Sequence, residues 1–346
     1  MGYGAKLRLK YWLANTFLVW LAILVYRENR YYSDFLRADA QTALLWIAVA
    51  YTILGFAFYA FIPDSRVSES KGFIVLRTIV RLFKGIFSFA PWSGFSGISR
   101  AEKIAIMFTA VKFFFLPIML NFALQNYNAF NVNYQLWQSN GFGLGSFVFN
   151  TAFYPLALSL IFLVDTVYFA FGYAVEAGFL KNVVRSVEPT FLGWAVTLAC
   201  YPPFNGYVVN YIGSYQNDFA AFESTTATIA LRVAVIFFLG IYLWATLALG
   251  AKCSNLTNRG IVSRGPYAIV RHPAYISKTM VWWITLIPFI LAAAEPRLII
   301  PAILSAAAWG LIYYLRSITE ERHLLRDPDY VEYCKKVKYK FIPGVY

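Results

Sequence analysis

The stretch Thr279–Leu315, TMVWWITLIPFILAAAEPRLIIPAILSAAAWGLIYYL, holds two apolar runs separated only by Glu295-Pro296-Arg297. A helix that crosses a bilayer needs about 20 mostly apolar residues, or somewhat fewer when its ends reach the interface. The runs 279–294 and 298–315 meet that length, and the short turn between them makes them antiparallel neighbours. The stretch therefore predicts a membrane-spanning helical hairpin whose two open ends lie on the same side.

The whole chain shares the apolar character of this hairpin. Of its 346 residues, 60% are hydrophobic and 14% are charged, and its mean hydropathy is +0.56, whereas soluble domains are about one quarter charged. Cys200, Cys253 and Cys334 are far apart and form no CxxC or Cys/His cluster, so neither a disulfide framework nor a metal site is indicated. The composition predicts an all-α, polytopic membrane bundle.

Eight segments are apolar enough to be expected as spans. They are about 11–26, 42–62, 104–123, 147–173, 187–204, 226–249, 279–294 and 298–315. The fifth is the weakest, because Pro189 lies near its start and Pro202-Pro203 near its end. No small-residue cleavage site follows Tyr26, so the first segment is interpreted as an anchor and not as a signal peptide.

The basic residues indicate an orientation. With eight spans and the N-terminus inside, 24 of the 30 Lys and Arg residues fall in inside segments and 4 fall in outside loops, as expected of cytoplasmic loops. The formal charge of +13 is therefore spread over loops and does not indicate nucleic-acid binding. Both termini are expected in the cytoplasm.

Two further features concern the N-terminal part, residues 1–249, which is expected as a membrane domain with about six spans. Residues 72–90 place Arg77, Arg81 and Lys84 at helical spacing among apolar residues, which predicts a helix in the cytoplasmic headgroup layer or, alternatively, a plain connector. Charged residues also occur in or near the spans, where each should face a partner or a wet cavity: Lys112, Asp165 and Arg232.

The hairpin brings two polar clusters to one side of the membrane. They are RGPYAIVRHPAY (264–275), before the hairpin, and RSITEERHLL (316–325), after it. On a continuing helix Arg316 and Glu320 share one face. Tyr267 and Tyr275 suit an adenine ring or a cationic sulfonium, which aromatic rings attract, and the Glu320 carboxylate suits an α-ammonium group. The clusters together predict a pocket for a sulfonium-bearing nucleotide.

At these residues the chain resembles the isoprenylcysteine carboxyl methyltransferase and phospholipid methyltransferase superfamily of integral membrane enzymes. The resemblance covers residues 250–346, the expected methyltransferase core. The matching residues are Gly-Pro-Tyr-x3-Arg-His-Pro-x-Tyr (265–275), Arg-x3-Glu-Glu-x2-Leu (316–324), Asp329-Tyr330-x2-Tyr333 and Phe341-Ile342-Pro343-Gly344.

The resemblance implies S-adenosylmethionine as the cofactor, with no metal, in a cytoplasmic pocket. It implies Arg316 on the side of the methyl acceptor, with the Glu320-Glu321 pair also in the catalytic set. By the same resemblance, the cofactor-binding residues are Gly260, Ile261, Val262, Tyr267, His272, Pro273, Ala274, Tyr275 and Glu320. Lys278 departs from the family pattern and leaves the acceptor side open.

The expected activity is methyl transfer to a lipid-like or prenylated acceptor, first of all isoprenylcysteine carboxylate O-methylation. A carboxylate or phosphate needs a cation such as Arg316 to orient it, whereas an amine, as in phospholipid N-methylation, needs a base such as Glu321 or His323. The alternatives of other classes are an NADPH-dependent reductase of the steroid 5α-reductase kind, which shares a Pro-x-Tyr loop, and a non-catalytic scaffold.

Overall fold

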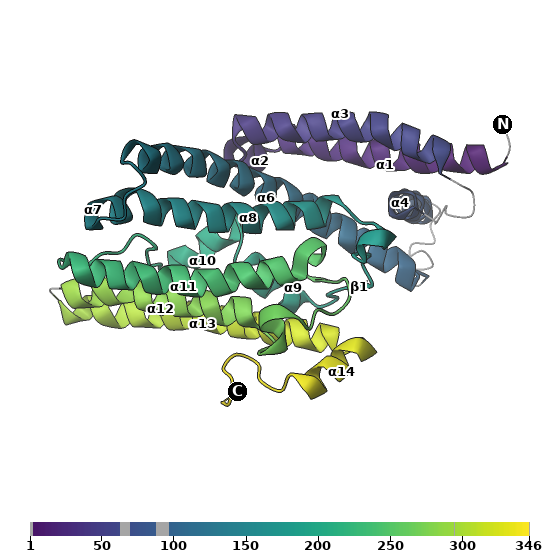
Figure 1. Ribbon diagram of the computed structural model, residues 1–346. Helices are drawn as coiled ribbons and strands as arrows, with labels where there is room; N and C mark the ends of the chain where they lie inside the picture. The colour runs from purple at the N-terminus through teal and green to yellow at the C-terminus, as the bar shows by residue number, and fades with distance from the viewer. Residues whose placement is uncertain (1–2, 63–69, 88–96, 294, 346) are drawn as a thin grey trace. The chain divides into compact units, whose positions relative to one another are not determined.

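The computed structural model describes residues 3–62, 70–87, 97–293 and 295–345. Within those residues the regular secondary structure is helical apart from one pair of two-residue strands (Figure 1). Seven of the described helices are long and apolar enough to cross a membrane, as in a multi-pass membrane protein. The chain divides into two compact units, Met1–Asn121 and Phe122–Tyr346.

The first unit is built on an antiparallel helix pair. Its elements are α1 (Tyr3–Glu28), α2 (Arg30–Phe35), α3 (Ala38–Phe61), α4 (Lys71–Phe87) and the first part of α6 (Arg100–Ser139). The short α2 turns the chain back, so that α3 packs along α1, and the Trp12 indole donates to the Thr52 carbonyl at 3.0 Å.

Helix α4, drawn nearly end-on in Figure 1, lies against α1. Its apolar residues Ile74 and Val75 pack on α1 and α6. The buried Glu102 carboxylate of α6 accepts a hydrogen bond from Thr78 and one from Arg81, each at 3.0 Å. The helix expected near 72–90 thus forms as far as Phe87, and residues 88–90 lie outside the described residues.

The second unit holds the remaining elements. They are α7 (Ser146–Val148), η2 (Phe149–Phe153), α8 (Tyr154–Ala174), η3 (Gly178–Leu180), β1 (Ser186–Val187), α9 (Phe191–Leu198), α10 (Phe204–Ile212), α11 (Thr225–Leu249), η4 (Gly250–Lys252), β2 (Thr257–Asn258), η5 (Gly265–Ala268), α12 (Pro273–Ala292), α13 (Pro296–Leu324) and α14 (Pro328–Lys336). Its core is apolar: Tyr154, Leu158 and Ile161 of α8, Val235, Leu239 and Tyr242 of α11, and Val281 of α12.

Helices α8 and α11 run in the same direction. Gly172, near the end of α8, lies so close to the loop after α11 that a Cβ there would meet the Cys253 carbonyl oxygen at 1.9 Å. Near the start of α11, Arg232 donates to the Asn150 carbonyl at 2.6 Å and to the Asn150 side-chain oxygen at 2.8 Å. The chain between these two helices must therefore return along the length of the unit.

That return is made by a broken segment. It leaves β1, forms the eight-residue helix α9, breaks at Pro202-Pro203 and forms the nine-residue α10. It then passes Trp309, whose indole donates to the Gly213 carbonyl at 3.0 Å. Tyr215 packs on Phe289 near the end of α12. Because proline lacks an N–H, the helix cannot continue through the pair.

The expected spans agree only in part with the described helices. Seven of them coincide largely with the seven long helices: 42–62 ends one residue past α3, 279–294 ends two residues past α12, and residue 294 lies outside the described residues. The segment 187–204 is not one continuous helix, because α9 is only about 12 Å long. The region 124–139, expected as a loop, continues α6. Helix α13 continues to Leu324, which confirms the shared helix of Arg316 and Glu320. The expected boundary at 249/250 lies inside the second unit, and that functional division stays a prediction.

The charges expected in spans have partners, and the Lys112 ammonium lies over the Phe108 ring, 5.9 Å from its centroid. The Asp165 carboxylate accepts hydrogen bonds from Tyr242 and Thr246, both at 2.6 Å, so this buried acid ties α8 to α11. Arg232 makes the bonds to Asn150 already described.

Candidate functional site

The two strands fasten the α11–α12 loop to the broken segment. β1 and β2 are antiparallel, with Ser186 opposite Asn258 and Val187 opposite Thr257. Just after β2, Gly260 has a φ of 91°, in the left-handed region that favours glycine. The pairing brings Glu188, the residue after β1, to the edge of the loop.

Asp327 holds the strands to the helix that follows α13. Its carboxylate accepts from Asn258 at 2.7 Å and from Arg185 at 2.9 Å, and it also accepts the Asp329 N–H at the start of α14. Burial alone would raise the pKa of Asp327, but the hydrogen bonds from Asn258 and Arg185 outweigh it, so this pKa lies below its ordinary value.

His272 is fixed between α12 and the segment after α14. Its backbone N–H donates to the Lys340 carbonyl at 2.9 Å, and the Arg271 N–H donates to the Tyr339 carbonyl at 3.0 Å. The imidazole stacks on the Tyr275 ring, with 5.2 Å between ring centroids and an 11° interplanar angle. The His272 and Tyr275 rings thus form an aromatic wall before the hairpin, and the backbone of residues 339–340, after the hairpin, supports it.

The two adjacent glutamates have different surroundings. Glu321 contacts Arg271 at 2.8 Å, His272 at 3.1 Å and Lys340 at 3.2 Å, so its carboxylate holds the histidine loop and the C-terminal segment together. Glu320 is 44% exposed and accepts the Tyr275 hydroxyl at 2.7 Å. Only Glu320 therefore faces an accessible space.

Arg316 is a buried cation with few partners. It is 6% exposed, its guanidinium donates to the Asn255 side chain at 3.2 Å, and its Nε has no hydrogen-bond partner. In the part of the chain that the structure describes, no carboxylate forms an ion pair with it. Aromatic rings surround the guanidinium at 5.2 to 6.0 Å: Tyr201, Tyr275 and Tyr313.

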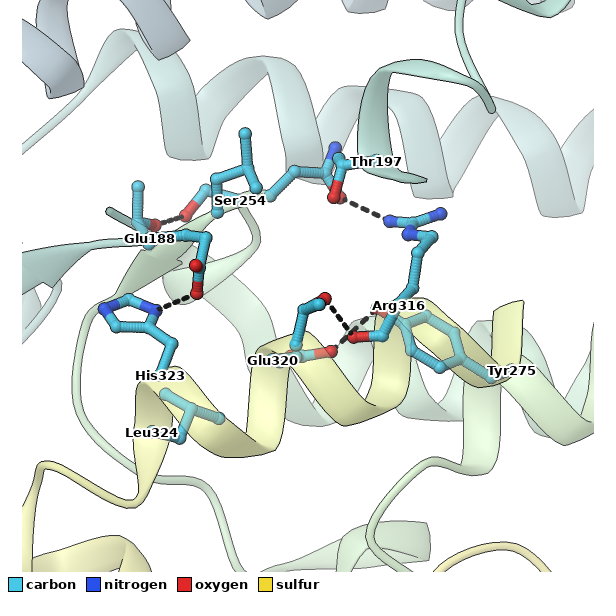
Figure 2. A pocket seen from close by; sticks show the side chains of 12 residues that line it. Glu188, Thr197, Ser254, Tyr275, Arg316, Glu320, His323 and Leu324 are labelled. Atoms are coloured by element: carbon cyan, nitrogen blue, oxygen red, sulfur yellow. Dashed lines mark hydrogen bonds and ion pairs between the residues drawn. The ribbon is translucent and has the colours of Figure 1, made fainter. Parts of the chain in front are cut away.

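A cavity of about 50 Å³ opens between α13, the 254–257 loop and the α9 region. Figure 2 shows Glu188, His323, Glu320, Arg316 and Tyr275 around this space. Its complete lining is Glu188, Thr197, Ser254, Asn255, Leu256, Thr257, Tyr275, Arg316, Thr319, Glu320, His323 and Leu324. The cavity is therefore polar, with groups of both charges on its wall.

The structure brings some of the expected residues together and separates others. Arg316, Glu320 and Tyr275 line the cavity, and His272 backs Tyr275. Pro273 and Ala274 open α12, and the Tyr267 carbonyl accepts the Tyr333 hydroxyl at 2.7 Å. The turn Gly260, Ile261 and Val262 does not line the cavity, and Ile261 packs on Tyr330 and Tyr333.

Sequence reasoning missed Glu188, Thr197 and Asn255. Glu188 stands 128 residues before Arg316, and no motif spacing connects them. The one available signal is a carboxylate at the edge of an apolar segment, where an unpaired charge is costly.

No protein-family model matches the sequence, and no curated protein matches it.

Proposed function

We propose that this chain is an integral membrane methyltransferase that uses S-adenosylmethionine and acts on a lipid-like or prenylated acceptor. The observation that carries the proposal is the joining of the two polar clusters across the hairpin. Tyr275 from the first cluster bonds to Glu320 of the second, and both line a cavity with the buried Arg316.

The cofactor fits the chemistry of this wall. Its sulfonium carries an electrophilic methyl group, and a cation of this kind is attracted by aromatic faces such as Tyr275. Glu320 is the accessible carboxylate for its ammonium, and the His272–Tyr275 stack offers a flat surface for its adenine. The other residues that the resemblance implies for the cofactor are Gly260, Ile261, Val262, Tyr267, Pro273 and Ala274.

The chain's own groups have separate tasks in this proposal. Arg316 attracts an anionic group of the acceptor, because its buried guanidinium has no carboxylate partner among the described residues. Glu321 positions His272 and is too fully engaged to act as a base. Orientation in a water-poor site is the main contribution that such a protein makes to a displacement reaction.

The proposed orientation places both termini and the cavity in the cytoplasm. The broken segment with α9 and α10 carries the chain along the second unit, so it serves as an eighth crossing in addition to the seven long helices. This count leaves the basic loops on the cytoplasmic side.

The experiment is to incubate purified full-length protein with methyl-labelled S-adenosylmethionine and a total lipid extract, and to identify the labelled product. Glu320→Ala and His272→Ala are expected to weaken cofactor binding about tenfold or more, whereas Arg316→Ala should lower turnover more than cofactor affinity. The matched control is Glu332→Ala, since Glu332 is exposed on α14 and forms an ion pair with Lys335, away from the cavity lining. Unchanged cofactor affinity in the first two variants, or thermal stabilisation by NADPH but not by S-adenosylmethionine, contradicts the proposal.

A further inference from the structure

The cavity wall carries two buried polar atoms of opposite charge without hydrogen-bond partners. They are Glu188 Oε2 and Arg316 Nε, and both residues line the same space. An unsatisfied buried polar atom is costly, and more so when it belongs to a charged group. Two such atoms on residues that line one cavity indicate a ligand that satisfies both.

The Glu188 side chain is held in place by its other oxygen. Oε1 accepts the Thr190 N–H at 3.0 Å, the Thr190 hydroxyl, and the Arg322 guanidinium at 3.3 Å. A Cβ on Gly193 would come within 2.4 Å of the Glu188 side chain, so glycine is required for this packing. Glu188 is therefore a fixed, 2% exposed side chain on the cavity wall, and its Oε2 has no hydrogen-bond partner.

Groups beside Oε2 leave room for a cationic or hydrogen-bond-donating ligand. The His323 ring lies 3.9 Å from Oε2, too far for a hydrogen bond, and its other nitrogen is engaged with the Ser186 hydroxyl at 2.8 Å. His323 thus backs the carboxylate without satisfying it.

We infer that this cavity binds a zwitterionic group, with its ammonium at Glu188 Oε2 and its anionic end at Arg316 Nε. The volume of about 50 Å³ has room for roughly three to four water molecules, which is the scale of an amino-acid or aminoalkyl-phosphate group. Glu188 already pairs with Arg322 through Oε1, so such a ligand adds a donor for Oε2 and a counter-charge for Arg316, and water alone does not supply the second.

Two molecules carry this chemistry: the methionyl end of S-adenosylmethionine, and the headgroup of an ethanolamine lipid. The first source rests on the proposed function but changes two of its assignments: Glu188 takes the cofactor ammonium in place of Glu320, and Arg316 takes the cofactor carboxylate in place of an anionic group of the acceptor. The second source does not rest on the proposed function and leaves both assignments as they are. Glu188 lies outside the part of the chain that resembles the methyltransferases, so the resemblance does not assign it a role.

The test measures binding to the full chain in non-ionic detergent with two matched pairs of probes. S-adenosylhomocysteine is compared with methylthioadenosine, which has the same nucleoside thioether but lacks the α-ammonium and α-carboxylate groups. Short-chain phosphatidylethanolamine is compared with phosphatidic acid, which lacks the ammonium. The wild type should prefer the zwitterionic member of one pair by about 10- to 100-fold.

The deciding variant is Glu188→Gln, which retains one oxygen for the hydrogen bonds from Thr190 and Arg322 and replaces the unpartnered Oε2 by an amide NH2 group. It should abolish the preference in that same pair, and Arg316→Gln should do so from the anionic end. Glu332→Gln, on the surface of α14, should keep the preference.

A full preference in Glu188→Gln, or no preference by the wild type in either pair, overturns the inference; a cavity that holds only water gives the second result. If only the lipid pair discriminates and neither nucleoside binds, the cavity inference stands and the proposed function fails.

Discussion

Replacing Glu321 by glutamine should release the segment after α14 from the histidine loop. The Glu321 carboxylate is the shared partner of Arg271, His272 and Lys340, at 2.8, 3.1 and 3.2 Å. The Lys340 side chain is 5% exposed and that of Glu321 16%, so the contact is largely screened from water. Loss of the carboxylate leaves a buried ammonium without its counter-charge.

The expected cost follows from this burial. Breaking one partner of a buried ion pair costs about 3–5 kcal/mol. The cost of Glu321→Gln should be smaller, because Arg271 keeps weaker bonds to the Val337 and Lys338 carbonyls, at 3.4 and 3.2 Å, and the glutamine side chain keeps one oxygen. We expect a loss of about 2 kcal/mol in the free energy that holds the segment. That energy corresponds to about 30-fold more frequent local opening.

Hydrogen exchange of the Arg271 and His272 amides measures this opening, because both donate to carbonyls of the same segment. Glu320→Gln is the matched control: Glu320 bonds to Tyr275, and its nearest approach to His272 is 3.8 Å. Equal exchange in Glu321→Gln and the wild type, or equal acceleration in both variants, would show that the Glu321 contacts do not hold the segment.

Two other changes have defined outcomes. Because the folded-state pKa of Asp327 is lowered, its contacts with Asn258 and Arg185 stabilise the fold fully above the unfolded carboxyl pKa of about 3.9, and this stabilisation is lost as the pH falls through the lower folded value. Hydrogen exchange of the α14 amides should therefore accelerate only below about pH 4. Asp327→Asn should abolish this acceleration, and an acceleration that the variant retains contradicts the assignment to Asp327. Gly172→Ala places a Cβ at 1.9 Å from the Cys253 carbonyl oxygen and should sharply reduce the yield of folded protein in size-exclusion chromatography. Gly178→Ala should leave the yield unchanged, because no atom lies within 4 Å of the added Cβ. Equal yields would mean that α8 and the loop after α11 are farther apart than described.

The helical hairpin was predictable because its two runs are uniformly apolar and their turn is only three residues long. Local pattern also placed Arg316 and Glu320 on one face, since the period of a helix continues past the membrane. Length and hydropathy were less informative where prolines interrupt the chain. The segment 187–204 has the composition of a span, yet its backbone breaks at Pro202-Pro203.

The candidate site was predictable only on one side. His272, Tyr275 and Glu320 belong to clusters that the hairpin brings together, so topology alone suggested their contact. Glu188 reaches the same cavity through the β1–β2 pair, which consists of two residues on each strand. So short a pairing has no periodicity in the sequence, and its register depends on tertiary contacts such as Asp327 with Asn258.

The bonds from Arg271 and His272 to Tyr339 and Lys340 have a consequence for biosynthesis. Each of the seven described helices that are long enough to span a membrane ends by residue 324, so residues 339 and 340 are synthesised after all of them. Until these two residues are made, the aromatic wall lacks its outer support. A chain that stops between residues 325 and 339 therefore has those seven helices and an unfinished pocket.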